Sequence, residues 1–183
     1  MAPAYQNREV AALTSLQSWE FLAVLAYGDG VERVAVEIES RESNVGEARR
    51  FVRRQLAFWG LPEDDGLVDR VLLVISELVT NAVVHGRTRP SEETESVGVT
   101  LAFRRGFALG VMVTDNSGDI PKVRIRPSAF ADCGRGLVLV NAESDAWTAA
   151  PRSGQQGVDG KAVWAFFQCP QPAALSELMP QPV

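Results

Sequence analysis

The sequence predicts an α+β fold, a two-layer α/β sandwich with helices on one face of a mixed, mostly antiparallel sheet. Strand-like segments occur in consecutive runs instead of alternating singly with helices, which is typical of this class. Two of these runs, 97–103 and 107–113, are joined by Arg104-Arg105-Gly106, a pattern that predicts a hairpin. The length of 183 residues suits one domain with terminal extensions.

The first half of the domain predicts a strand and then a helix. Apolar side chains alternate along residues 34–38, as in a half-buried strand. Ser43 or Asn44 can cap the next helix. Its apolar residues recur at helical spacing over 48–59, and Gly60 stops it.

A second helix carries the widest apolar stripe of the chain. Asp64 or Asp65 opens it, apolar side chains line residues 68–79, and it ends near His85-Gly86. Residues 87–96 are polar and turn-like. The elements after the hairpin are a loop at 115–130, a short helix at 137–141, and strands at 146–149 and 162–168 separated by a Gly/Gln loop at 153–160.

Three segments are expected along the chain. Residues 1–30 form an N-terminal extension, in which 21–27 fits either a short helix or a strand. Residues 31–168 form the main domain. Residues 169–183 form a Pro-rich tail whose composition predicts disorder.

Charge and cysteine content narrow the functional classes. The net charge is −5 and the cations are scattered, which argues against direct nucleic-acid binding. Arginine pairs at 49–50 and 53–54 fit a solvated helix face or, as the alternative, a partner surface. Two cysteines support neither a zinc site nor a disulfide framework. No signal-peptide pattern or membrane-spanning apolar run is present, so a cytoplasmic protein without membrane contact is expected.

The most informative motif lies in the second helix. Glu77 and Asn81 are four residues apart, so they share one face of an otherwise apolar helix. Polar side chains beside a buried stripe need partners. The alternative is that Glu77 lies at the solvent edge. His85, the only histidine, fits a structural role at the helix C-terminus.

Two further motifs follow at strand and helix ends. The apolar strand before Asp115 delivers this carboxylate into a glycine turn, where it can accept a hydrogen bond from a ligand or simply cap the turn. Gly134, Arg135, Gly136 and Leu137 open the short helix, where glycines allow close approach of a phosphate to free N–H groups.

Several common nucleotide and metal motifs are excluded by their spacing. The helix reads Glu-x-x-x-Asn-x-x-x-His, which is not the His-Glu-x-x-His of zinc proteases. Leu139 occupies the third glycine position of a dinucleotide fingerprint. Gln155 and Ala162 break the Walker A pattern around Lys161.

In this order and spacing, the three motifs resemble the GHKL superfamily of ATPases and kinases. The similarity covers residues 31–168 and is nearest to the anti-sigma-factor serine/threonine kinase branch, especially small actinobacterial ATP-binding regulators. The likeness to this branch is carried by residues 48–62, which lead into the motif at residues 76–86. The resemblance implies a histidine-kinase-like ATPase fold that binds ATP and Mg²⁺.

The resemblance also implies a role for each motif residue. Asn81 coordinates Mg²⁺, a hard cation that takes few protein ligands beside phosphate oxygens. Glu77 acts as the general base toward an attacking hydroxyl. Asp115 accepts a hydrogen bond from the adenine amino group, which disfavours GTP.

The phosphate end of the site is implied in the same way. Gly134, Arg135, Gly136 and Leu137 close an ATP lid that spans 119–133. Three roles are open for the basic residues in and after the lid: contact with phosphate, contact with a partner, or exposure to solvent. These residues are Lys122, Arg124, Arg126 and Arg135.

This chain departs from the family pattern in its adenine loop. Ser117 and Asp119 hold the two glycine positions of Asp-x-Gly-x-Gly, and Gly118, which we assign to the nucleotide site, is one residue off. The later Gly-Thr of many relatives reads Gly160-Lys161 here.

Two functions are therefore expected as alternatives. The first is an Mg·ATP-dependent serine/threonine kinase that phosphorylates an anti-sigma-factor antagonist and sequesters a sigma factor. The second is a non-catalytic module whose nucleotide state controls partner binding. A domain that binds no nucleotide is a third, weaker option. The resemblance also implies a homodimer. A histidine kinase is disfavoured because no second histidine is present to accept phosphate.

Overall fold

The computed structural model describes residues 18–61, 63, 66–90, 93–121, 135–154 and 157–169. Within them, five strands form one sheet in the order β1-β2-β3-β5-β4. The strands are β1 (Glu32–Glu39), β2 (Ser96–Arg104), β3 (Ala108–Asp115), β4 (Ala146–Gly154) and β5 (Gly157–Gln168). All four strand pairs are antiparallel. The sheet was expected to be mixed and mostly antiparallel, but the described strands contain no parallel pair.

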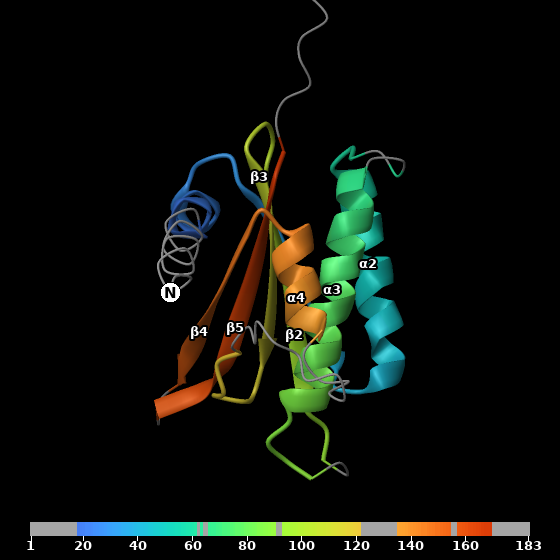
Figure 1. The fold of residues 1–183 in the computed structure, drawn as a ribbon, viewed down its shortest axis with the longest axis vertical. Coiled ribbons are helices and arrows are strands. Elements are labelled where there is room, and N and C mark those ends of the chain that lie inside the picture. The colour runs from blue at the N-terminus through green and yellow to red at the C-terminus, as the bar shows by residue number, and fades with distance from the viewer. Residues whose placement is uncertain are drawn as a thin grey trace, which may run out of the picture.

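The helices form a layer on one face of this sheet (Figure 1). They are the 3-10 helix η1 (Glu42–Asn44), α2 (Val45–Phe58), α3 (Gly66–His85) and α4 (Arg135–Glu143). The α+β sandwich is thus confirmed. One helical segment, residues 18–27, lies instead on the opposite face, drawn in blue in Figure 1. This segment belongs to the expected N-terminal extension, outside the domain for which helices on one face were predicted.

The main core lies between α2, α3 and the sheet. Val52 and Leu56 of α2 and Ile75 of α3 are almost completely buried against β-strand residues such as Leu101 and Phe167. Their helical spacing fixes which face of each helix turns inward. No helix among the described residues combines the length and apolar character needed to cross a membrane.

The second core explains the helix at residues 18–27, which resolves the choice between helix and strand left open by the sequence. Phe21 stacks on Phe166 of β5 with ring centroids 5.5 Å apart, and Leu25 is fully buried. Gly110 of β3 makes room, because a Cβ atom there would lie 2.8 Å from Leu25 Cδ1. The Arg33 guanidinium also donates two hydrogen bonds to the Leu25 carbonyl.

Turn residues end the elements as their chemistry predicts, with one exception. Gly60, at φ 78°, ends α2, and Leu61 N–H donates to the Leu56 carbonyl at 3.0 Å. Gly106, at φ 73°, closes the β2–β3 hairpin. The exception is Asn44, which precedes α2 without a side-chain capping bond. Asp64 and Asp65 lie outside the described residues.

The predicted loop at 153–160 is instead mostly part of a long hairpin. Strand β4 continues to Gly154, β5 begins at Gly157, and a register shift occurs between Pro151 and Ser153. The side chains of Arg152 and Ser153 are exposed. Hydrogen bonds between the two backbones hold this extension of the hairpin. Because its side chains are not packed in a core, the sequence shows no alternation of apolar residues there.

Arg70 of α3 fixes the far end of α4. Its Nε donates to the Glu143 carbonyl at 2.7 Å, and its Nη2 lies 3.2 Å from Asp145 Oδ1. Its guanidinium lies over the Phe167 ring, 5.6 Å from the centroid. These contacts set the position of α4 on α3.

We predict that Leu25→Ala lowers the free energy of unfolding by about 2–5 kcal/mol, because it removes a fully buried side chain and leaves a cavity. The matched control is Tyr27→Ala in the same helical segment, where the side chain is 88% exposed and a change within about 0.5 kcal/mol is expected. Urea unfolding measures both. Equal stabilities of the two variants would contradict the packing of residues 18–27 on the sheet.

Candidate nucleotide site

The polar pair Glu77 and Asn81 lies on α3 where the first turn of α4 packs against it. Both residues are half-buried. A Cβ atom at Gly136 would lie 2.7 Å from Glu77 Oε2 and 3.2 Å from Asn81 Nδ2. Only a glycine therefore leaves this contact undisturbed, and Glu77 does not simply face open solvent.

A pocket of about 280 Å³ opens beside this contact, between α3, α4 and the ends of β3 and β5. Apolar side chains, among them Leu78, Val113 and Val163, form part of its lining. Its polar side is formed by Asn81, His85, Asp115, Asp119, Gly136 and Lys161. A pocket with apolar walls and a few convergent polar groups is typical of a small-molecule site.

Asp115 ends β3 as a buried carboxylate, 4% exposed. Its Oδ1 accepts hydrogen bonds from Ser117 N–H and from Lys161 Nζ, each at 2.9 Å. Lys161 lies directly across from Asp115 in the β3–β5 ladder. The sequence left open whether Asp115 caps a turn or faces a ligand. It caps the turn and also lines the pocket.

Two glycines allow the chain to approach Asp115 closely. A Cβ atom at Gly86 would lie 2.5 Å from both Cβ and Cγ of Asp115. A Cβ atom at Gly160 would lie 2.0 Å from the Asp115 carbonyl oxygen, and Gly160 has a φ of 118° that favours glycine. The position of Asp115 thus depends on the absence of side chains on both neighbouring segments.

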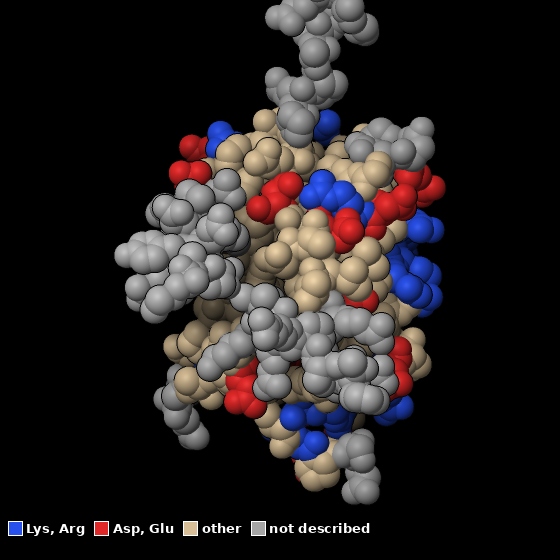
Figure 2. Space-filling view, viewed as in Figure 1, with Lys and Arg blue, Asp and Glu red and all other residues tan. Residues whose placement is uncertain are grey.

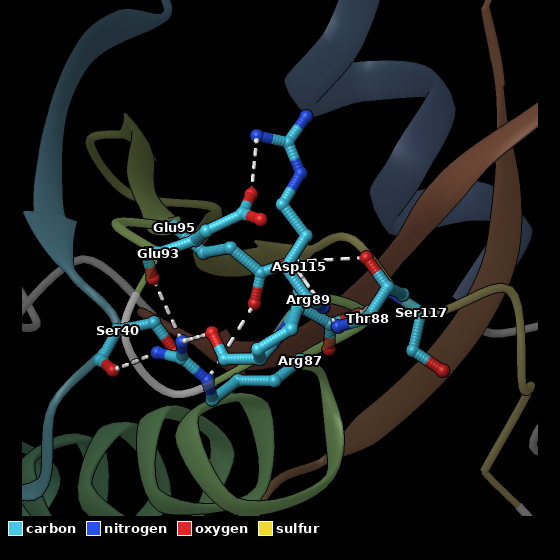
Figure 3. Close-up of polar contacts among 9 residues, drawn as sticks. Ser40, Arg87, Thr88, Arg89, Glu93, Glu95, Asp115 and Ser117 are labelled. Carbon is cyan, nitrogen blue, oxygen red and sulfur yellow. Dashed lines mark hydrogen bonds and ion pairs between the residues drawn. The ribbon is translucent and has the colours of Figure 1, made fainter.

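The segment after Gly86 is held by Arg87 and Glu95 (Figure 3). Arg87 donates to the carbonyls of Ser40 at 2.9 Å and Glu93 at 2.9 Å. Glu95 Oε1 accepts from Thr88 N–H at 3.1 Å and Thr88 hydroxyl at 2.9 Å. These bonds tie the end of α3 to the start of β2.

The charge of Glu95 is stabilised despite its burial. Burial raises the pKa of Glu95, but hydrogen bonds from Thr88 and Arg89 N–H, with the nearby Arg87 guanidinium, outweigh it. The pKa of Glu95 therefore lies below its ordinary value of 4.5.

The structure brings together several of the residues expected from the sequence. Asn81, Asp115, Gly136 and Leu137 line one pocket, with Glu77 adjacent through Gly136. Gly118 is not among the lining residues; a Cβ atom there would lie 3.0 Å from Val158 Cγ1. The described residues do not include Gly134, the side chain of Arg135, or the lid cations Lys122, Arg124 and Arg126.

Lys161 and His85 are two polar pocket residues whose place there was not predicted. In the sequence, Lys161 lies in an incomplete Walker A pattern and takes the place of the threonine in the family's Gly-Thr. A single lysine within an apolar strand was the available signal, because a buried lysine needs a partner. His85 was expected to be structural, and it also lines the pocket, one helical turn beyond Asn81.

The residues present fit a magnesium ion shared with a phosphate. Asn81 offers an amide oxygen and Glu77 a carboxylate on one face of α3, beside the first turn of α4. Mg²⁺ commonly takes one or two protein ligands and completes its shell with phosphate oxygens and water. Among the described residues, no group of three or more acidic, histidine or cysteine side chains is placed to hold a metal ion.

Fold and pocket together define an α+β domain with a small-molecule site between its helices and its sheet. A comparison with protein-family models matches residues 38–165 to the histidine kinase-like ATPase domain. A search of curated proteins finds no match. Because the matched region spans more than half of the chain, the chain belongs to the histidine kinase-like ATPase domain family. This membership is consistent with ATP binding and confirms the superfamily expected from the sequence.

We predict that Gly136→Ala weakens Mg·ATP binding by about tenfold or more without lowering stability. The new methyl group displaces Glu77 and Asn81, whereas alanine is a better helix former than glycine. Gly46→Ala in α2 is the matched control, because its Cβ atom would meet only the end of the Arg50 side chain at 3.4 Å. Calorimetry and urea unfolding measure the two effects. Unchanged ATP affinity in Gly136→Ala would contradict the proximity of this turn to the nucleotide.

We also predict that Glu95→Gln lowers the free energy of unfolding by about 1–3 kcal/mol at pH 7, because charge-assisted hydrogen bonds are lost. The folded pKa of Glu95 is below 4.5, so the stabilisation is complete above pH 4.5 and disappears as pH falls through the folded value. The difference from wild type should therefore shrink in acid. Glu93→Gln, whose side chain is 57% exposed, is the control, and a change within about 0.5 kcal/mol is expected. A wild-type difference that stays constant in acid would contradict this role of Glu95.

Proposed function

We propose that this domain binds Mg·ATP in the described pocket and transfers the γ-phosphoryl group to a serine or threonine of a protein antagonist of an anti-sigma factor. The observation that carries the proposal is the contact of Glu77 and Asn81 with the first turn of α4, beside a pocket that ends at Asp115. It gathers a carboxylate, an amide oxygen and a helix start at one place. Phosphoryl transfer needs mainly positioning and charge stabilisation, which such an arrangement supplies.

Each residue has a distinct role in this proposal. Asn81 would hold Mg²⁺, which would supply positive charge to the phosphate oxygens. Glu77 accepts the proton of the attacking hydroxyl group. The hydroxyl oxygen bonds to the γ-phosphorus as the bond to ADP breaks and ADP leaves. The backbone N–H groups at the start of α4 face the phosphates. Asp115 accepts from the amino group of adenine.

A non-catalytic nucleotide-binding module is the second candidate. Ser117 and Asp119 replace glycines in the adenine loop, and Lys161 occupies Oδ1 of Asp115. These differences from the family pattern lie where adenine is proposed to bind, and they leave the Glu77 and Asn81 pair unchanged. They favour a domain in which nucleotide exchange, and not phosphotransfer, is the regulated event.

The α2 arginines support a protein partner with an acidic surface. Figure 2 shows basic side chains gathered along the α2 edge of the domain. They are the exposed side chains of Arg49, Arg50, Arg53 and Arg54, none of which forms an ion pair with another described residue. A groove of about 480 Å³ runs beside them toward Ser76 of α3. We propose an antagonist, a sigma factor or both as the partner, and a homodimer as the assembly.

We predict that wild-type protein is stabilised by about 2.7 kcal/mol at a Mg·ATP concentration 100-fold above its dissociation constant. Asn81→Ala should lose most of the Mg²⁺-dependent part of this stabilisation. Glu77→Gln should keep it, while phosphotransfer to candidate antagonists falls by about 10²–10⁴-fold. Thr80→Ala, an exposed change on the same helix, is the control that leaves both quantities unchanged.

The outcomes separate the candidates. No stabilisation at millimolar Mg·ATP would remove nucleotide binding and both proposals. ATP binding without transfer to any antagonist would favour the non-catalytic module, in which Glu77→Gln retains regulatory activity in cells. Wild-type transfer by Glu77→Gln would contradict the general-base role.

A further inference from the structure

The base end of the pocket contains a buried cation. Lys161 is 7% exposed, lies on β5 opposite Asp115 and lines the pocket. Lysine is rarely buried without a partner, and Asp115 Oδ1, 2.9 Å from Nζ, is the nearest one. The opposite charges of Lys161 and Asp115 nearly cancel. The pair as a whole therefore neither repels nor attracts a flat, uncharged heterocycle.

The ammonium has one hydrogen left to donate. It carries three hydrogens and no acceptor. Within the part of the chain that the structure describes, Nζ contacts Asp115 Oδ1 at 2.9 Å and, more weakly, the Ser117 carbonyl at 3.5 Å. The third hydrogen has no acceptor there.

Asp115 offers the complementary group. Its Oδ1 already accepts from Ser117 N–H and from Lys161. Among the described residues no group donates to its Oδ2. A free carboxylate oxygen and a free ammonium hydrogen therefore lie on neighbouring residues at the wall of one pocket.

Adenine presents the matching pair of groups on one edge. Its 6-amino group is a donor and the adjacent ring nitrogen N1 is an acceptor, whereas guanine presents an acceptor at position 6 and a donor at N1. We propose that Lys161 is a specificity-determining residue that donates directly to N1 of adenine, while Asp115 accepts from the 6-amino group. The inference rests on the proposed binding of ATP in this pocket. A buried polar group left unpaired by the wrong base is a strong source of selectivity.

An experiment with base analogues distinguishes this role from simple neutralisation of Asp115. Calorimetry gives dissociation constants for Mg·ATP and for its 1-deaza analogue, in which C–H replaces N1, with wild type and Lys161→Met. Wild type should bind the 1-deaza analogue about tenfold or more weakly than ATP, as expected for loss of a hydrogen bond to a charged donor. Lys161→Met should bind ATP more weakly and should no longer distinguish the two ligands.

Two controls keep the result interpretable. Arg152→Met removes an exposed positive charge from β4 and should preserve the preference for ATP over the 1-deaza analogue. The 7-deaza analogue, which is changed in the imidazole ring and keeps both N1 and the 6-amino group, should bind wild type with little loss. If Lys161→Met does not fold, Lys161→Gln keeps a neutral donor and should show a smaller but measurable preference.

The remaining outcomes overturn the proposal. An equal 1-deaza penalty in wild type and Lys161→Met would assign Lys161 a purely structural role. Tighter binding of GTP than of ATP by wild type would reverse the assignment of donor and acceptor. Absence of any nucleotide binding by wild type would instead reject the proposed function itself, and is therefore distinguishable from failure of this inference.

Discussion

The packing of α3 is the constraint on which the site depends. This helix contacts the sheet, α2 and α4, and its residues Val71, Ile75 and Val79 are completely buried. Burial on this scale fixes the rotation of the helix, since turning it would expose the apolar stripe. The face that carries Glu77 and Asn81 is thereby held toward α4, where Gly136 allows backbone and side chains to meet.

The opposite end of the pocket is organised by close backbone approach. Gly86 follows α3, Gly160 lies in β5, and both press against Asp115 at the end of β3. Their lack of side chains lets three elements converge on one carboxylate, whose charge is then balanced by Lys161. In our proposal, selectivity for a base and stability of the sheet end therefore depend on the same few atoms.

Much of this could be read from patterns along the chain. The helical spacing of apolar residues predicted α2 and α3, the stop at Gly60 was confirmed, and the Arg104-Arg105-Gly106 hairpin has the expected turn. The motif residues Asn81, Asp115 and Gly136 were predicted as one site because family resemblance supplied their relation. The β4–β5 extension was missed because its exposed strand residues are held by backbone bonds, which have no side-chain signature.

By itself, the sequence determined the class of fold and the family, and it indicated candidate residues for a nucleotide site. These depend on local periodicity and on short motifs, which are properties of neighbouring residues. The tertiary structure alone decided that residues 18–27 cover the far face of the sheet, that all described strand pairs are antiparallel, and that Lys161 meets Asp115 across 46 positions of chain. Such contacts arise because distant segments pack to bury apolar surface and pair charges, and no local pattern encodes which segments will meet.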